Sequence, residues 1–159
     1  MKKYELLVED TITFFGVQLF RIKALISFSG IEKGEIGGYI ASEKNLSQYG
    51  NAWVYGDARV SGNAEVYGNA RVSGNAWVYG NARVYGNADY IVFKNTWSSG
   101  RYFTYTKSNR KWRVGCFYGD GHELIEKAYK DSKKSGDFYK AYVEFVEKLE
   151  TIENIYKEQ

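Results

Sequence analysis

Apolar residues recur at a spacing of six through the middle of the chain. A Gly-Asn-Ala or Gly-Asp-Ala triplet begins at Gly50, Gly56, Gly62, Gly68, Gly74, Gly80 and Gly86. A Val follows two residues after each Ala as far as Val84, and Tyr90 closes the series. Because six is a multiple of the two-residue period of a strand, Val and Ala keep the same side of it. The pattern predicts short strands with Val and Ala pointing inward, joined at Gly-Asn corners that tolerate a positive φ.

The Gly-Asn-Ala-x-Val repeat resembles the left-handed parallel β-helix hexapeptide family, in which three hexads make one triangular coil. The resemblance covers residues 36–92. The repeat is also similar to that of uncharacterised prophage and bacterial proteins, which are often labelled acyltransferase-like or polymer-forming. For this chain the resemblance implies a left-handed coil whose strand edges need a cover at each end.

Three hexads contain 18 residues, so each side chain is predicted to lie beside the one 18 positions later. Two columns follow: Tyr49, Tyr67 and Tyr85 in one, and Trp53, Arg71 and Asp89 in the other. Two pairs follow as well: Arg59 beside Trp77, as a cation over an indole, and Glu65 beside Arg83, as an ion pair. Two interpretations stay open. Either the columns and pairs of side chains only stabilise the coil, or the aromatic faces form a surface for a ligand or another subunit.

The flanks of the repeat carry strand patterns. Residues 1–35 predict an N-terminal β cap, with strands at Tyr4–Val8, Thr11–Phe15 and Val17–Ser27, the last two joined as a hairpin around Gly16. The β-helix occupies residues 36–92, and residues 93–159 form a C-terminal cap. Within that cap, strands at Arg101–Thr106 and Lys111–Tyr118 flank a turn over residues 107–110.

Two helices are expected after these strands. Asp120 and Glu123 have the spacing of a capping box and begin the first helix, which Gly136 ends. The second helix carries an apolar stripe that is expected to seal the coil or to meet another subunit: Phe138, Tyr142, Phe145, Leu149, Ile152 and Tyr156. The predicted fold class is mainly β: a short left-handed parallel β-helix capped by an N-terminal β segment and by a C-terminal β-hairpin plus two helices.

Composition narrows the class of protein. A chain with 44% hydrophobic and 26% charged residues is ordinary for a soluble globular protein, but 18% aromatic residues and 15 Tyr are unusual. The single Cys fits a reducing compartment, the acidic residues that soon follow the N-terminus do not fit a signal peptide, and no apolar run is long enough to span a membrane. These features predict a cytoplasmic protein with no membrane partner, and the resemblance to prophage proteins implies that the cytoplasm is that of a bacterial host.

Charge is unevenly distributed, although the net charge of +3 is too small to favour a nucleic-acid partner. Residues 94–119 contain six basic residues and no acidic one, whereas the residues that follow are rich in Glu and Asp. Arg101, Arg110, Trp112 and Arg113 have the side chains to hold a phosphate or a base. The alternative is that this basic hairpin pairs with the acidic helices of its own chain.

Catalytic chemistry has few candidates. The acyltransferases of the resembling family are trimers that bind acyl-coenzyme A between coils, and many use a coil His as general base. The only His here, His122, follows the repeat, and no loop interrupts residues 50–90. Cys116 lies in an apolar stretch and is expected to be a buried, inert thiol. One His and one Cys do not complete a usual four-ligand metal site, so no metal, cofactor or catalytic residue is predicted.

The sequence therefore favours a non-catalytic binding protein. The resemblance to prophage proteins implies a phage or prophage protein that counters host defence by binding a host protein or by sequestering a nucleotide signal, as a homo-oligomer with a trimer favoured. An acyltransferase using acyl-coenzyme A is the main alternative; a structural polymer and a nucleic-acid binder are less favoured. The candidate binding residues are Tyr49, Arg59, Tyr67, Trp77, Arg83, Tyr85, Arg101, Arg110, Trp112 and Arg113.

Overall fold

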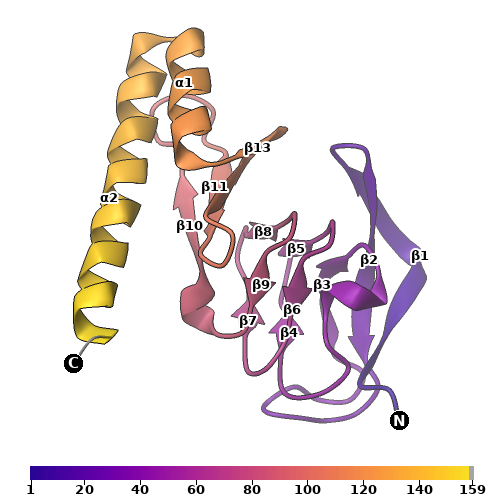
Figure 1. Ribbon diagram of the computed structural model, residues 1–159. Coiled ribbons are helices and arrows are strands. Elements are labelled where there is room, and N and C mark those ends of the chain that lie inside the picture. Colours follow the sequence, from indigo (N-terminus) through magenta and orange to yellow (C-terminus); the bar gives the residue numbers. More distant parts are fainter. Residues whose placement is uncertain (158–159) are drawn as a thin grey trace.

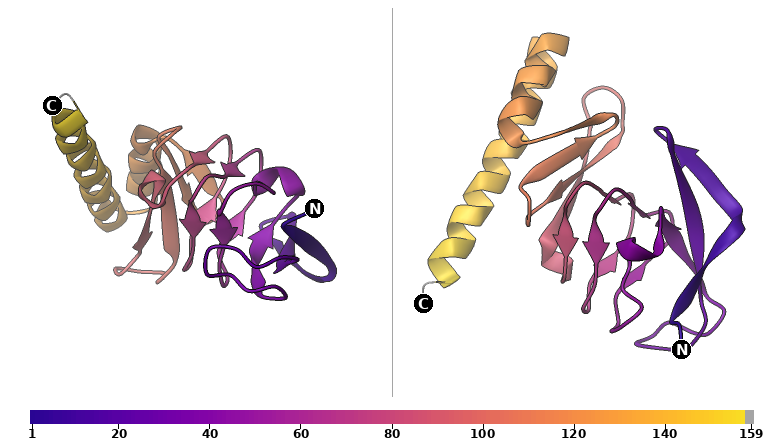
Figure 2. Two further views of the ribbon diagram at one scale, coloured as in Figure 1. Left: turned by 90° about the horizontal axis from the view of Figure 1, so that it is seen from below. Right: turned by 45° about the vertical axis from the view of Figure 1, so that its right-hand side comes forward.

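The computed structural model describes residues 1–157 and places them in three parts along the molecule (Figure 1). A β-hairpin lies at one end, a three-sided coil of very short strands lies in the middle, and a four-stranded sheet covered by two helices lies at the other end. Two further views show the same order, with the hairpin and the helices on opposite sides of the coil (Figure 2).

The coil is built from pairs of parallel strands whose partners are 18 residues apart. β4 (Trp53–Val54) pairs with β7 (Arg71–Val72), β5 (Arg59–Val60) with β8 (Trp77–Val78), and β6 (Glu65–Val66) with β9 (Arg83–Val84). β3 (Ile36–Ile40) extends the second of these columns by pairing with β5. The register predicted from the six-residue period is confirmed.

The interior of the coil consists of the repeated Val and Ala side chains. Ala52 to Ala82 and Val54 to Val84, taken at six-residue spacing, are fully buried. The corner glycines from Gly50 to Gly80 all have a positive φ, between 55° and 74°. A Cβ is disfavoured in this region, so Gly makes the corner at low cost. The inward Val and Ala and the glycine corners are as predicted.

The seventh repeat does not make a corner. Gly86 is extended at φ −141°, and Asn87–Asp89 form a 3₁₀ turn that leads the chain out of the coil. Asp89 therefore does not continue the column of Trp53 and Arg71, and that prediction is wrong. Its carboxylate instead accepts hydrogen bonds from the N–H groups of Tyr85 and Gly86, at 2.8 and 2.9 Å.

The N-terminal hairpin consists of β1 (Tyr4–Phe14) and β2 (Val17–Ala24), which are antiparallel, and β2 pairs with β3 of the coil. The two strands predicted before the hairpin turn form one strand whose register shifts between Leu7 and Thr11. Phe15 and Gly16 make the turn, both with positive φ.

The C-terminal sheet is antiparallel in the order β10 (Tyr90–Lys94), β11 (Tyr102–Thr106), β12 (Lys111–Val114) and β13 (Phe117–Gly119). The single strand expected over 111–118 is wrong, because Gly115 at φ +57° turns the chain there. Cys116 lies in this turn and is exposed, so the prediction of a buried thiol is wrong as well. The boundary drawn at residue 92 falls inside β10.

Two helices cover one face of this sheet. α1 (Gly121–Asp131) begins as predicted, since the Asp120 side chain accepts a hydrogen bond from the Glu123 N–H at 2.8 Å. α2 (Lys133–Lys157) begins after Ser132, so Gly136 does not end the first helix but lies in the first turns of the second. Gly136 packs under the ring of Tyr129, which leaves no room for a Cβ.

The buried face of α2 differs from the predicted stripe. The helix packs on the sheet with Tyr139, Val143 and Val146, whereas most of the predicted stripe remains exposed. A helical pattern reports that a face is apolar but not what covers it, and here a second face covers the sheet. In residues 1–157, no helix combines the length and apolar character needed to cross a membrane.

The C-terminal sheet lies between the helices and the end of the coil. Phe103, Tyr105 and Trp112 point to the helices and form one core with them. Thr104 alternates with these residues and faces the coil, where its Oγ1 accepts a hydrogen bond from the backbone N–H of Trp77 at 2.9 Å. Alternation along a strand therefore separates two cores, one inside the coil and one under the helices.

The two ends of the coil are capped by opposite chemistry. In this parallel stack the first layer has free carbonyl groups and the last layer has free N–H groups. Donors meet the first layer, where Lys3 Nζ donates to the Ala52 carbonyl at 2.8 Å and the Tyr4 hydroxyl to the Leu46 carbonyl at 2.6 Å. Acceptors meet the last layer: besides Thr104, Ser108 Oγ accepts from the Arg83 N–H at 2.7 Å. Occupied edges argue against end-to-end stacking of coils, which is the structural-polymer interpretation.

Candidate functional site: an arginine-lined cleft

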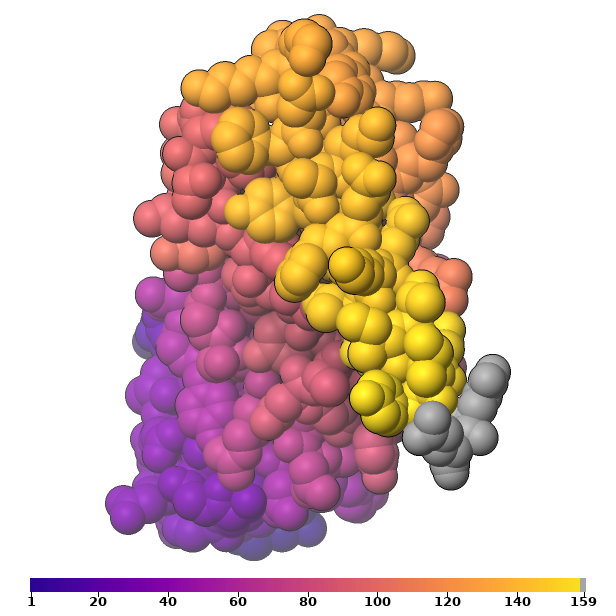
Figure 3. Space-filling model, turned by 90° about the vertical axis from the view of Figure 1, so that its left-hand side faces the viewer, coloured from indigo at the N-terminus to yellow at the C-terminus, as the bar shows by residue number. Residues whose placement is uncertain are grey.

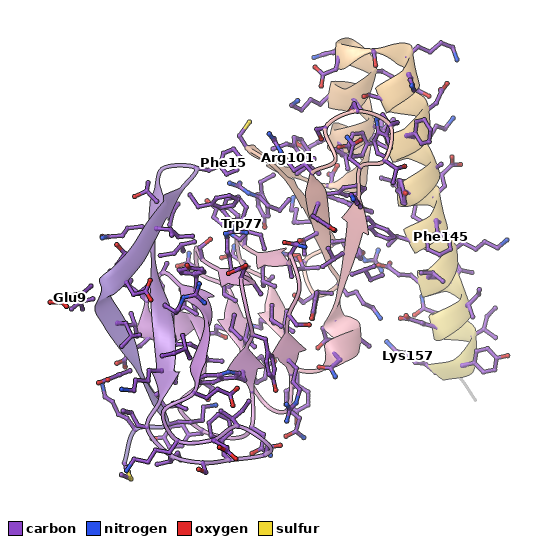
Figure 4. All side chains as sticks on the ribbon, turned by 180° about the vertical axis from the view of Figure 1, so that it is seen from behind. Glu9, Phe15, Trp77, Arg101, Phe145 and Lys157 are labelled. Atoms are coloured by element: carbon purple, nitrogen blue, oxygen red, sulfur yellow. The ribbon has the colours of Figure 1, made fainter. Side chains whose placement is uncertain are left out.

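A cleft of about 300 Å³ opens where the three parts of the molecule meet. We call it the arginine cleft; its lining consists of Phe14, Phe15, Arg59, Asn75, Trp77, Arg101, Tyr102, Thr104, Arg113 and Gly115. Figure 4 shows Phe15 of the hairpin and Arg101 of the C-terminal sheet close together above Trp77 of the coil. Four of the candidate binding residues predicted from sequence meet here, from segments up to 54 positions apart (59 to 113).

Trp77 forms the floor of the cleft and is held on several sides. Only 5% of the residue is exposed, and its indole N–H donates to Ser61 Oγ at 2.7 Å. Phe15 stacks on it with ring centroids 5.6 Å apart, and Phe14 meets it edge-on at 4.6 Å. The indole is therefore a fixed wall, with Phe15 as the more exposed aromatic surface above it.

Each of the three arginines lies over an aromatic ring. The guanidinium carbon of Arg113 is 3.8 Å from the Trp77 ring centroid, that of Arg59 is 4.0 Å from Phe14, and that of Arg101 is 5.8 Å from Phe15. Arg59 and Trp77 are neighbours in register, as predicted, but the cation over the indole is Arg113. The repeat alone could not show that a strand 36 residues later (77 to 113) covers this ring.

The cleft carries uncompensated positive charge. None of its lining residues within the described chain is acidic, and no carboxylate of residues 1–157 forms an ion pair with Arg59, Arg101 or Arg113. The Nε atoms of Arg59 and Arg113 are buried without a hydrogen-bond partner. Burial also lowers the pKa of the Arg113 guanidinium from its ordinary value. An anion in the cleft would balance this charge through the guanidinium groups that line it, because guanidinium donors match carboxylate and phosphate oxygens.

The turn between β12 and β13 lies beside Arg101. The end of the Arg101 side chain lies directly against Gly115 of this turn, which has a positive φ. The positive φ favours Gly at this position, whereas a Cβ would only require the flexible end of Arg101 to shift.

Four other predicted residues lie in a separate groove between the coil and α2, which we call the α2 groove: Tyr67, Arg83, Tyr85 and Arg110. Tyr67 and Tyr85 meet edge-on with centroids 5.1 Å apart. Tyr49 is 85% exposed, so it is not held in a stack and the three-ring column predicted from sequence is wrong.

Charges in the α2 groove are paired within the chain. Arg83 lies 3.7 Å from Glu65, as predicted, and Arg110 lies 3.7 Å from Glu150. Lys107 forms an ion pair with Glu153 of α2. This half of the basic hairpin therefore pairs with the acidic helix of its own chain, and only the half that faces the coil contributes to the arginine cleft.

The prediction that Trp112 is a binding residue is wrong. It is 1% exposed and belongs to the core under the helices, against Phe103 and Tyr105. Arg113 is its immediate neighbour and points to the opposite face of the strand. One-residue alternation therefore places one of the pair in a core and the other in the cleft.

The catalytic candidates of the acyltransferase interpretation lie elsewhere. The His122 side chain is 81% exposed in the first turn of α1, with Nε2 3.0 Å from a Glu126 oxygen. The neighbouring cavity contains the carboxylates of Asp120, Glu147 and Glu150, which would repel phosphate groups. No group of three side chains within residues 1–157 has the arrangement to hold a metal ion.

Sequence reasoning missed the hairpin side of the arginine cleft. Phe14 and Phe15 come from a turn about 60 residues before Trp77, and Asn75 and Thr104 also line the cleft. Two adjacent aromatic residues before the Gly16 turn were a signal that this tip packs on something, although not on what.

Comparison with known proteins supports the architecture of the coil. A family model described as "YdcK Beta solenoid repeat" matches residues 64–80 and 78–88. The chain is a β-solenoid repeat protein. The matched residues contain β6 to β9 and Trp77, whereas Phe15, Arg101 and Arg113 lie outside them. A search of curated proteins found no match. The floor of the cleft thus belongs to the matched part of the solenoid. The N-terminal hairpin and the C-terminal sheet, which form its other sides, lie outside the matched residues.

Proposed function

We propose that this protein is a non-catalytic binding protein whose arginine cleft holds a small anionic ligand of nucleotide type. The observation that carries the proposal is the set of three arginines, Arg59, Arg101 and Arg113, which line a cleft without acidic residues and form no ion pair within residues 1–157. Like charges gathered without a counter-charge repel one another, and an anionic group between them removes that cost. The solenoid, in this proposal, is a left-handed hexapeptide coil that serves as a rigid platform.

The shape of the cleft narrows the ligand class. A volume of about 300 Å³ is at the small end of ligand pockets. Phe15 and Tyr102 leave 44% and 41% of their surface exposed at its mouth, so a flat ring can stack there while phosphate oxygens meet the arginines. A nucleotide combines both features. The resemblance of the repeat to prophage proteins makes a nucleotide signal of host defence, bound in the cytoplasm, the first ligand to examine.

Isothermal titration calorimetry with a panel of nucleoside mono- and diphosphates, cyclic nucleotides and coenzyme A tests the proposal. Arg113→Gln should weaken nucleotide binding by at least about tenfold, since one charge-assisted contact contributes about 1.5–3 kcal/mol. Arg83→Gln is the matched control, because it removes the same charge from the exposed side of the solenoid. Its affinity should equal that of the unaltered protein.

Other results would point to other functions. Binding of coenzyme A together with acyl transfer that His122→Ala abolishes would favour the acyltransferase alternative. If no member of the panel binds, or if Arg113→Gln binds as tightly as the unaltered protein, the ligand role of the cleft is wrong. A host protein, as partner of a homo-oligomer, is then the remaining candidate from sequence.

A further inference from the structure

The outer face of α2 carries a second apolar stripe that its own sheet covers only in part, since Tyr142 packs against Phe93 while most of the other side chains stay exposed. We call it the heptad seam; its residues alternate at spacings of four and three: Phe138, Tyr142, Phe145, Leu149, Ile152 and Tyr156. Phe145 is 50% exposed and Tyr156 is 71% exposed, while Tyr142 and Leu149 lie at the margin of the buried face. Figure 3 looks onto this side of the molecule, where α2 crosses the surface from the top to the lower right.

The four-three spacing is that of the a and d positions of a coiled coil. A helix that only packs on a sheet needs one apolar face, and α2 already has one in Tyr139, Val143 and Val146. The stripe continues beyond the helix onto Trp97, whose ring is stacked on Phe138 at 4.6 Å and an interplanar angle of 1°. A continuous apolar surface of this kind marks an interaction site.

We propose that the heptad seam is covered by the α2 helix of a second copy of this chain, parallel and in register, as a two-stranded coiled coil. With Phe145 at d, Lys148 occupies g and Glu153 occupies the e position of the next heptad. In a parallel pair these positions meet across the interface with opposite charge, whereas an antiparallel pair places Lys148 against Lys148 of the second copy.

Both flanking side chains are placed to make that contact. Among residues 1–157, Lys148 forms no ion pair. The Glu153 side chain remains 42% exposed although its Oε2 pairs with Lys107. Charge complementarity across the seam therefore favours a second copy over an unrelated apolar partner.

The buried face of α2 limits the assembly to two copies. Tyr139 and Val146 occupy e positions and are already packed against the sheet of their own chain. Apart from Glu153, which keeps 42% of its side chain exposed, what remains is the narrow strip of a and d residues. A narrow strip matches a two-stranded seam rather than the wider core of a bundle. This interface is independent of the arginine cleft and differs from the trimer expected from sequence.

Sedimentation equilibrium on the full chain tests the proposal. The unaltered protein should be a dimer at micromolar concentrations, and Phe145→Glu with Ile152→Glu should raise the dimer dissociation constant at least a hundredfold. Val8→Glu is the control, because Val8 is an exposed apolar residue of the distant hairpin. Circular dichroism checks that α2 stays helical. A monomer of the unaltered protein at about 100 μM overturns the proposal.

A charge swap tests the seam without changing its apolar residues. Lys148→Glu should weaken the dimer, and Glu153→Lys in the same chain should restore it. For orientation, Phe145→Cys in a Cys116→Ser background should form a disulfide with itself on oxidation. In an antiparallel pair Phe145 faces Leu149 of the second copy instead. Cross-linking only in a mixture of Phe145→Cys and Leu149→Cys chains would therefore overturn the parallel arrangement.

Discussion

At the residue scale, single polar side chains form hydrogen bonds with the backbone groups at the two ends of the solenoid, where no further coil supplies a partner. Lys3 is the clearest case, since it is 2% exposed and reaches the carbonyls of Gly50 and Ala52. Its ammonium also lies 5.0 Å from the Phe28 ring centroid. A buried charge is tolerated here because donors are needed at the first layer of the solenoid.

Burial of Lys3 predicts an unusual dependence of stability on pH. Desolvation lowers the pKa of Lys3 from 10.5 to about 8. Between these values the unfolded chain holds a proton that the folded protein has released. The unfolded state therefore binds more protons, and the free energy of unfolding should rise as the pH increases above 8.

Urea unfolding between about pH 7.5 and pH 9 measures this rise, at pH values where tyrosines of the unfolded chain are still mostly protonated. Lys3→Met should abolish the dependence on pH. Lys2→Met is the matched control, because the Lys2 side chain is 61% exposed and should leave the dependence intact. A flat profile of the unaltered protein would contradict the assigned shift.

At the element scale, the solenoid corner is a local unit whose geometry depends on one backbone angle. Six corner glycines share a positive φ, while Gly86 occupies the same place in the repeat with an extended backbone. Local pattern was sufficient for the six and misleading for the seventh. What differs at Gly86 is the next element, since the chain must leave the coil to reach β10.

Gly74 and Gly86 allow a matched test of this difference, because a Cβ at either would meet nothing within 4 Å. Gly74→Ala should lower the free energy of unfolding by about 1–2 kcal/mol, which is the cost of a left-handed backbone with a Cβ. Gly86→Ala should be neutral or stabilising by up to about 1 kcal/mol, because it restricts only the unfolded chain. Equal losses in urea unfolding would show that conformation does not distinguish the two corners.

At the scale of the whole molecule, the C-terminal sheet joins the solenoid to the helices. Its Thr104 hydroxyl caps a strand of the last coil, and its neighbours Phe103 and Tyr105 belong to the helix core. The same junction brings Arg101 and Arg113 to Trp77. The candidate binding site exists only because this sheet docks on the end of the solenoid.

Thr104→Val tests that junction with little change of shape. The substitution leaves the backbone N–H of Trp77 buried without an acceptor, so the free energy of unfolding should fall by about 1–3 kcal/mol. Thr104→Ser is the control, because it keeps the hydroxyl and should recover most of the loss. Chemical denaturation followed by tryptophan fluorescence reports both. A valine variant as stable as the serine variant would mean that the hydrogen bond does not support docking.

Elements that depend on local chemistry could be predicted from the sequence. The six-residue period placed Val60 beside Val78 and set the corner glycines, and the Asp120–Glu123 pair located the start of α1. Each of these depends on residues near one another in the chain or on a repeated rule. That is why patterns in the sequence were enough to place these elements.

What each face of these elements packs against depends on long-range contacts in the folded molecule. Long-range packing placed Arg113 instead of Arg59 over Trp77, buried Trp112 in a core, and left Phe145 half-exposed at the margin of the sheet. An apolar or basic face has several energetically acceptable partners. Long-range docking selects among them through contacts that leave no periodic trace in the sequence.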